Sequence, residues 1–179
     1  MLKKNIQYHR YTDYVHPKDS IISMLNTALS FTPSKQSTIP YKVLVFGPNQ
    51  TKIKDFLYQA TISPPPEDPS VKCDHNHQVE APWVLLFYER TKENSQGFKQ
   101  SSEVVGIEVG MFCANLTQIC LSAGLNVSYT KCFLPKRHKI WQDAPVKRPL
   151  LALSIGIGEE NKVIGRRQRP ENKKIFLYK

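Results

Sequence analysis

Residues 102–123 constrain the fold of this chain more than any other segment. The run has helical spacing and is apolar on most faces, so the helix that it predicts must be buried on most of its faces. Gly106, Gly110 and Ala114 recur at every fourth position and form one smooth stripe. Because a glycine weakens a helix by about 1 kcal/mol relative to alanine, this stripe indicates a close contact with another helix. That helix could come from the same chain, as residues 19–30, or from a second subunit.

The rest of the chain alternates between helical and strand-like segments. Its length of 179 residues fits one domain, and a sheet flanked by helices is the architecture that the order of elements implies, in the α+β or the α/β class. Apolar periodicity and turn residues predict helices at 19–30 and at 49–60 with Asn49 as the cap, and strands at 41–46, 83–88, 149–158 and 175–178.

Positive charge is concentrated near the C-terminus. Residues 131–179 hold 13 Lys and Arg against 4 Asp and Glu, and thus carry nearly all of the formal net charge of +10. Such a field favours anionic partners, such as a nucleotide phosphate, a nucleic acid or an acidic surface. Ordinary solvated surface charge is the alternative.

Three features favour an intracellular protein. No apolar run reaches the roughly 18 residues of a membrane-spanning helix, and residues 1–5 lead into polar sequence without the apolar core of a signal peptide. The four cysteines lack paired metal-ligand spacing, and Cys113 and Cys120 lie in the apolar helical run, as buried thiols do. We therefore expect a cytoplasmic location without a membrane partner.

A polar turn between two prolines precedes the first predicted strand, and it carries the most informative motif. Pro33-Ser34-Lys35-Gln36-Ser37-Thr38-Ile39-Pro40-Tyr41 resembles the Pro-Ser-x-x-Asn-x-Gln-Pro-Trp signature of the FMN-dependent nitroreductase family, with Ser37 in the place of the asparagine. Three further segments follow in the order of that family, namely Ala-Pro and a strand at 81–86, the central helix at 109–125, and the last core strand at 150–158 with the basic segment 167–170.

The resemblance implies a short, divergent member of this family. It implies an α+β fold with a central, mostly antiparallel sheet flanked by helices. It also implies a homodimer in which residues 1–179 form one domain and residues 170–179 add a strand to the partner subunit. The activity implied is an oxidoreductase that carries reducing equivalents from NAD(P)H through FMN to a small organic acceptor. The flavin performs that chemistry, so no side chain is expected to be catalytic.

The residues expected to bind FMN follow from the matched motifs. The planar guanidinium of an arginine can bind a phosphate through two parallel hydrogen bonds. On an extended segment, two arginines separated by one residue point to the same side. The N-terminal segment 8–12 resembles the family's Arg-Arg-Ser-x-Arg in two possible alignments, in which Arg10 matches either the first or the last arginine. The expected cofactor-binding residues are Arg10, Thr12, Ser34, Ser37, Arg167 and Arg169.

Alternatives to this function are left open by the sequence. The chain could be a protein of this fold that binds a flavin or another anion without redox turnover. A nucleic-acid-binding role for the basic C-terminal part is a weaker alternative, because no helix-turn-helix or aromatic platform is recognisable. Cys73, His75 and His77 alternate as zinc ligands can, but no fourth ligand is evident, so we expect no metal. We expect instead a polar loop that meets the flavin edge through Asn76 or Gln78.

Overall fold

The described residues form a sheet of four strands, each antiparallel to its neighbours. The computed structural model describes residues 7–8, 10–62, 75–90 and 100–160, so Cys73, Arg167, Arg169 and the predicted strand at 175–178 lie outside the described residues. The sheet order is β1-β2-β4-β3, with β1 and β3 at the edges. The strands are β1 (Tyr41–Phe46), β2 (Trp83–Glu89), β3 (Asn126–Thr130) and β4 (Leu151–Gly156).

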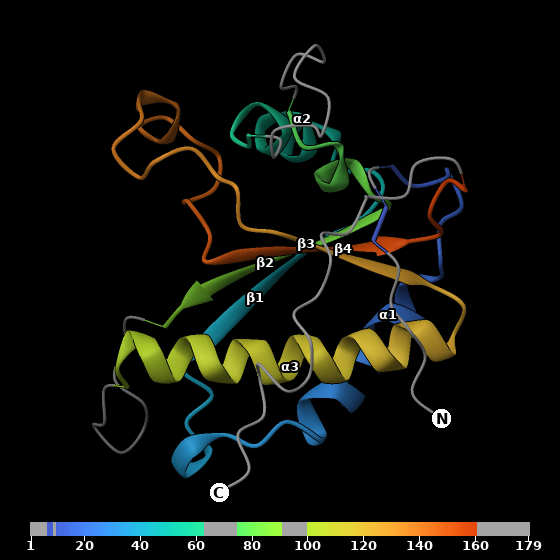
Figure 1. The fold of residues 1–179 in the computed structure, drawn as a ribbon, viewed down its shortest axis with the longest axis vertical. Helices are drawn as coiled ribbons and strands as arrows, with labels where there is room; N and C mark the ends of the chain where they lie inside the picture. The colour runs from blue at the N-terminus through green and yellow to red at the C-terminus, as the bar shows by residue number, and fades with distance from the viewer. Residues whose placement is uncertain (1–6, 9, 63–74, 91–99, 161–179) are drawn as a thin grey trace, which may run out of the picture.

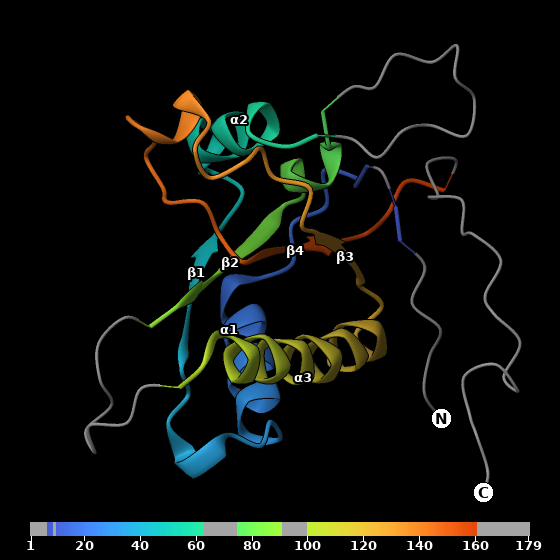
Figure 2. The ribbon, with the colours of Figure 1, turned by 60° about the vertical axis from the view of Figure 1, so that its left-hand side comes forward.

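Helices cover both faces of this sheet, as Figures 1 and 2 show. The long α3 (Ser102–Ser122) and α1 (Lys18–Ser30) lie on one face. The short α2 (Thr51–Gln59) and the 3₁₀ turn η2 (His77–Glu80) lie on the other. Two further 3₁₀ turns, η1 (Lys35–Ser37) and η3 (Lys139–Trp141), stand in the connections. The predicted α+β class with an antiparallel sheet is therefore confirmed.

Two apolar cores result, one on each face of the sheet. Successive side chains of a strand point to opposite faces, so Leu85 and Phe87 of β2 pack towards α1 and α3, whereas Val84 and Leu86 pack towards α2 and η2. Both faces of β2 are covered, and residues 83–88 are accordingly all buried. This explains why β2 reads in the sequence as a continuous apolar run rather than an alternating one.

Both ends of α3 are set by local chemistry. The Ser101 hydroxyl accepts a hydrogen bond from the N–H of Val104 and caps the first turn. At the other end, Gly124 has φ +79° and the N–H of Leu125 returns to the carbonyl of Cys120. A side chain at that φ is disfavoured, so glycine ends the helix as predicted.

One face of α3 is open in the described part of the chain. Gly106 and Gly110 are exposed, and a Cβ added at either would meet no atom within 4 Å outside the helix's own turns among the described residues. Ile107, between them, is 55% exposed. Packing of the glycine stripe against residues 19–30 of the same chain is therefore wrong, since no atom of those residues lies within 4 Å of a Cβ placed at Gly106 or Gly110.

By length and composition alone α3 could also cross a membrane. Its buried side, which includes Val109, Phe112 and Leu116, instead packs into the core shared with the sheet. That is the arrangement of a core helix in a soluble protein.

The remaining sequence predictions differ from the structure in detail. Residues 19–30, 41–46, 83–88 and 102–123 form the expected elements within a residue or so at each end. The second helix begins at Thr51 with Gln50 at its cap, so the prediction of Asn49 as the capping residue is wrong. The sequence predicts no range for β3, because its polar residues alternate with only one strongly apolar side chain.

Candidate functional site

The N-terminal segment is fixed against the end of β4. The N–H of Thr12 donates to the carbonyl of Ile157 over 2.8 Å, and Tyr11 forms a β-bridge with Gly158. A Cβ at Gly158 would overlap the ring of Tyr8, so only glycine leaves room for this segment. The backbone on either side of Arg10 is therefore anchored to the sheet.

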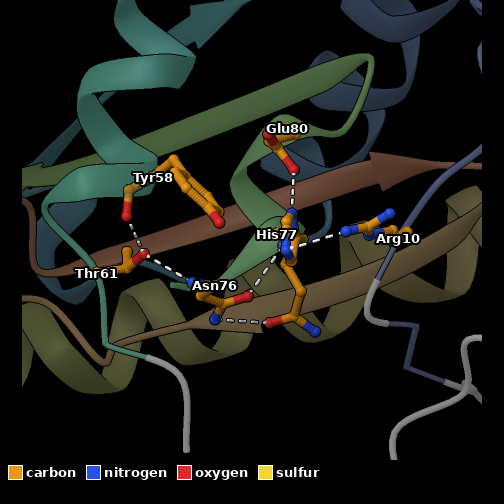
Figure 3. A network of polar contacts seen from close by, with 7 residues as sticks. Arg10, Tyr58, Thr61, Asn76, His77 and Glu80 are labelled. Carbon is orange, nitrogen blue, oxygen red and sulfur yellow. Dashed lines mark hydrogen bonds and ion pairs between the residues drawn. The ribbon is translucent and has the colours of Figure 1, made fainter. Parts of the chain in front are cut away.

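The side chain of Arg10 is oriented by η2, as Figure 3 shows. Its Nη2 lies 3.2 Å from Nε2 of His77, and Nδ1 of His77 lies 2.6 Å from Oε2 of Glu80. A guanidinium can only donate, so the Nε2 of His77 must accept, and its Nδ1–H must donate to the carboxylate of Glu80. The ring of Tyr58 packs against His77 with centroids 4.9 Å apart. Arg10 is exposed, so this chain of contacts holds a cation at the surface.

Asn76 and Gln78 support this turn from inside. Both are buried, at 7% and 2% exposure. The Nδ2 of Asn76 donates to Thr130, and the Nε2 of Gln78 donates to the carbonyl of Tyr8 over 3.0 Å. With their amides occupied in this way, they brace η2 against β3 and the N-terminal segment. His77, which the sequence suggests only as part of a zinc-ligand pattern, is the residue of this loop that contacts Arg10.

A second polar group lies in the turn after α1. Gln36, Ser37 and Ile39 have φ values of 55°, 54° and 42°, in the left-handed region that side chains disfavour by about 1–2 kcal/mol each. The Ser34 hydroxyl accepts the N–H of Ile39 over 2.9 Å and so closes the turn from within. Ser37 is exposed, and its side chain has no hydrogen bond to the described residues.

The two groups do not meet within one chain. Tyr11, next to Arg10 and Thr12, packs into the core under α2, whereas Ile39 packs into the core under α1 and α3. They therefore lie on opposite faces of the sheet, and Figures 1 and 2 show the two segments at opposite ends of the molecule. The single chain brings Arg10 together with Thr12, and Ser34 with Ser37, but does not join the pairs.

A metal site is not apparent in the described part of the chain. No group of three His, Cys, Asp or Glu side chains there is arranged to hold an ion. His75 and His77 both pack on the ring of Tyr58, at 4.9 Å between centroids, and His75 Nδ1 bonds to the carbonyl of Thr61.

The chain matches known proteins in its fold but not in its sequence. No protein-family model matches the chain, and no curated protein matches it in sequence. Solved structures, in contrast, match it over nearly its whole length. A protein described as a nitroreductase in complex with FMN, from Desulfovibrio desulfuricans, superposes with a TM-score of 0.69 at 15% identity, covering 98% of this chain and 92% of its own. The chain has a nitroreductase-like fold.

Two further nitroreductase-like structures support this assignment. A nitroreductase family protein from Streptococcus pneumoniae gives a TM-score of 0.67 at 16% identity, over 99% of this chain and 97% of its own. A protein from Staphylococcus epidermidis described as an NAD(P)H:FMN oxidoreductase gives 0.68 at 12% identity, over 97% and 92%. The nitroreductase resemblance inferred from four short motifs is thus confirmed at the level of the fold.

Proposed function

We propose that this protein is a cytoplasmic, homodimeric FMN-dependent oxidoreductase. It would transfer reducing equivalents from NAD(P)H through bound flavin to a small organic acceptor. The nitroreductase-like fold carries this proposal, together with the printed descriptions of two proteins that share it, one in complex with FMN and one named as an NAD(P)H:FMN oxidoreductase. When bound, the flavin would supply the hydride chemistry.

The residues present suit such a cofactor. Arg10 forms a hydrogen bond to His77 through one Nη, which leaves its other nitrogens without a partner among the described residues. An exposed guanidinium held in a fixed orientation matches a phosphate or the polar edge of a flat ring. Ser37 offers an exposed hydroxyl, while Ser34 shapes the turn around it. Thr12 fixes the backbone next to Arg10.

Arg167 and Arg169 belong to the same proposal. They lie outside the described residues, and their role as phosphate ligands rests on the Arg-Gln-Arg-Pro motif. Replacing both by alanine should weaken FMN binding sharply, since each charge-assisted hydrogen bond contributes about 1.5–3 kcal/mol. Unchanged affinity in an FMN titration would remove both residues from the site.

The homodimer is proposed on two observations. The open face of α3 presents Gly106, Ile107 and Gly110, an apolar surface that fits close contact with a second helix. The strand β1, at an edge of the sheet formed by the described residues, exposes Leu44 and Val45, at 40% and 41%, and an added strand could pair with the free edge of its backbone there. Residues 170–179 of the partner subunit are the strand that we propose for this role.

A shared site follows from the separation of the two polar groups. In a dimer, Arg10 and Thr12 of one subunit could face Ser34 and Ser37 of the other. The absorption spectrum of the purified protein tests flavin binding directly, because bound oxidised flavin absorbs visible light. Bleaching on addition of NADH or NADPH under nitrogen distinguishes an oxidoreductase from a flavin-binding protein without turnover. A colourless protein that takes up no added FMN would refute the proposal.

Mixed dimers test whether the site is shared. Arg10→Ala damages one half of the site, and Ser37→Asp places an anion in the other half at a position where aspartate tolerates left-handed backbone. If the halves come from different subunits, a heterodimer of the two variants holds one intact site and one doubly damaged site. It should bind FMN at half the wild-type stoichiometry although each variant alone binds poorly.

The matched control is Ser37→Asn, because asparagine is uncharged and, like aspartate, tolerates a left-handed backbone conformation. It should retain FMN affinity. If the heterodimer binds no better than its parents, the site lies within one chain and the shared arrangement is wrong.

A further inference from the structure

A buried carboxylate lies beneath the turn that carries Ser37. Glu108, in the middle of α3, is 2% exposed. It is the one charged residue among the buried residues of this fully described helix. A buried charge is unfavourable unless hydrogen bonds compensate for it, so its partners indicate what it does.

The one described partner of Glu108 lies in the turn and not in the helix. Oε1 of Glu108 accepts the backbone N–H of Lys35 over 2.8 Å, at the first residue of η1. Oε2 is buried and has no hydrogen-bond partner within the described residues. Because the carboxylate forms its one described bond with a backbone group, this bond depends on the conformation of the turn and not on the identity of residue 35.

The turn needs such support, because it is strained. The left-handed residues Gln36, Ser37 and Ile39 all lie within four positions after Lys35, and such conformations persist only where surrounding contacts fix them. At the far side of the turn, Nη1 of Arg90 donates to the carbonyl of Ile39 over 3.1 Å. The strained residues are therefore held between a carboxylate at their start and a guanidinium at their end.

We propose that Glu108 is a positioning residue for the cofactor site. Its carboxylate holds the turn in the left-handed conformation that presents the Ser37 side chain outward, and it does so without touching the ligand. This inference rests on the proposed flavin-binding function for its consequence, but the effect on the turn itself is independent of any ligand.

Three variants test the proposal, each measured in two ways. Glu108→Leu replaces the acceptor by an apolar side chain of similar size, and Glu108→Gln keeps an oxygen that can accept the N–H of Lys35. Asn115→Ala is the matched control, since Asn115 ties the same helix to Phe31 and Thr32, just before the turn. The first measurement is hydrogen exchange at the Lys35 amide without ligand, and the second is FMN affinity by fluorescence titration.

The expected pattern separates positioning from stability. In Glu108→Leu, exchange at Lys35 should accelerate roughly 10- to 100-fold, the factor that corresponds to a lost hydrogen bond to a charged group. FMN affinity should fall about 10-fold or more for the same reason. Glu108→Gln and Asn115→Ala should stay within about 3-fold of the wild type in both measurements, even if Asn115→Ala lowers the melting temperature.

Other results would overturn either the inference about Glu108 or the proposed function. Unchanged exchange at Lys35 in Glu108→Leu overturns the inference, whatever happens to FMN binding. Faster exchange with unchanged FMN affinity also overturns it, because the turn would then not position the ligand. Wild-type protein that binds no FMN refutes the proposed function alone, and the exchange rates still decide whether Glu108 holds the turn.

Discussion

Lys54 of α2 offers the sharpest test of the structure away from the candidate site. Its side chain is 6% exposed, and its Nζ donates to the carbonyl of Pro82 over 2.9 Å. Burial lowers the pKa of this amine from the ordinary 10.5 to about 8. A shift of this size means that keeping the charged form buried costs about 3 kcal/mol below pH 8.

Replacing Lys54 by methionine removes this cost but also the hydrogen bond to Pro82, which stabilises the fold by about 1.5–3 kcal/mol. The difference leaves Lys54→Met about 1 kcal/mol more stable than the wild type at pH 7. The comparison changes as pH rises. Because the folded pKa lies below the unfolded one, the unfolded chain binds more protons between pH 8 and 10.5, so the wild type gains stability across this window.

The gain between pH 7 and pH 10 is about 2.5 kcal/mol, so the order of stability should reverse. Urea unfolding of both proteins, followed by circular dichroism at half-unit steps from pH 7 to 10, measures the difference directly. Groups that titrate alike in both proteins cancel from it. Lys52→Met, at an exposed lysine of the same helix, controls for the loss of one positive charge. A stability difference that stays constant across this range would refute the assignment of Lys54 as a buried, weakly basic amine.

Three further predictions follow from packing and burial. Gly158→Ala should place a methyl group against the ring of Tyr8 and lower the free energy of unfolding by about 1–3 kcal/mol, as denaturant titration would show; unchanged stability would mean that the N-terminal segment is not packed there. Gly110→Leu should leave the monomer folded, since the position is open, but shift the proposed dimer to monomers in sedimentation velocity. A dimer that survives this change does not use that face. Burial raises the pKa of the Cys113 and Cys120 thiols to about 12, so a thiol reagent at pH 8 should modify neither until the protein is unfolded, and rapid labelling of the native protein would contradict their burial.

The regular elements could be predicted from the sequence because local physics fixes them. Gly124 ends α3 through a backbone angle that glycine adopts freely, and the continuous apolar run of β2 reflects burial on both faces. β3 had no predicted range because its packing depends on the rest of the sheet rather than on its own polar residues.

The candidate site was less predictable, because its contacts join distant segments. His77 reads in the sequence as one part of a histidine-rich loop, and only the fold places it against Arg10. Glu108 reads as one of several polar residues in a mostly apolar helix, and its partner, the N–H of Lys35, is a backbone group that no side-chain pattern reveals. The motif match selected Ser34 and Ser37 as candidates, but it could not show that they lie across the sheet from Arg10.

Because Arg10 and Ser37 lie on opposite sides of the sheet, binding of one ligand to both would depend on the concentration of the protein. A compact ligand that contacts Arg10 and Ser37 together has to be held by two chains, because the sheet and both cores stand between these residues in one chain. Its binding would then require two protein molecules for each site. The apparent affinity would fall as the protein is diluted below the concentration at which the chains associate. Saturation of the site would therefore report how much of this protein a cell contains, as well as how much ligand.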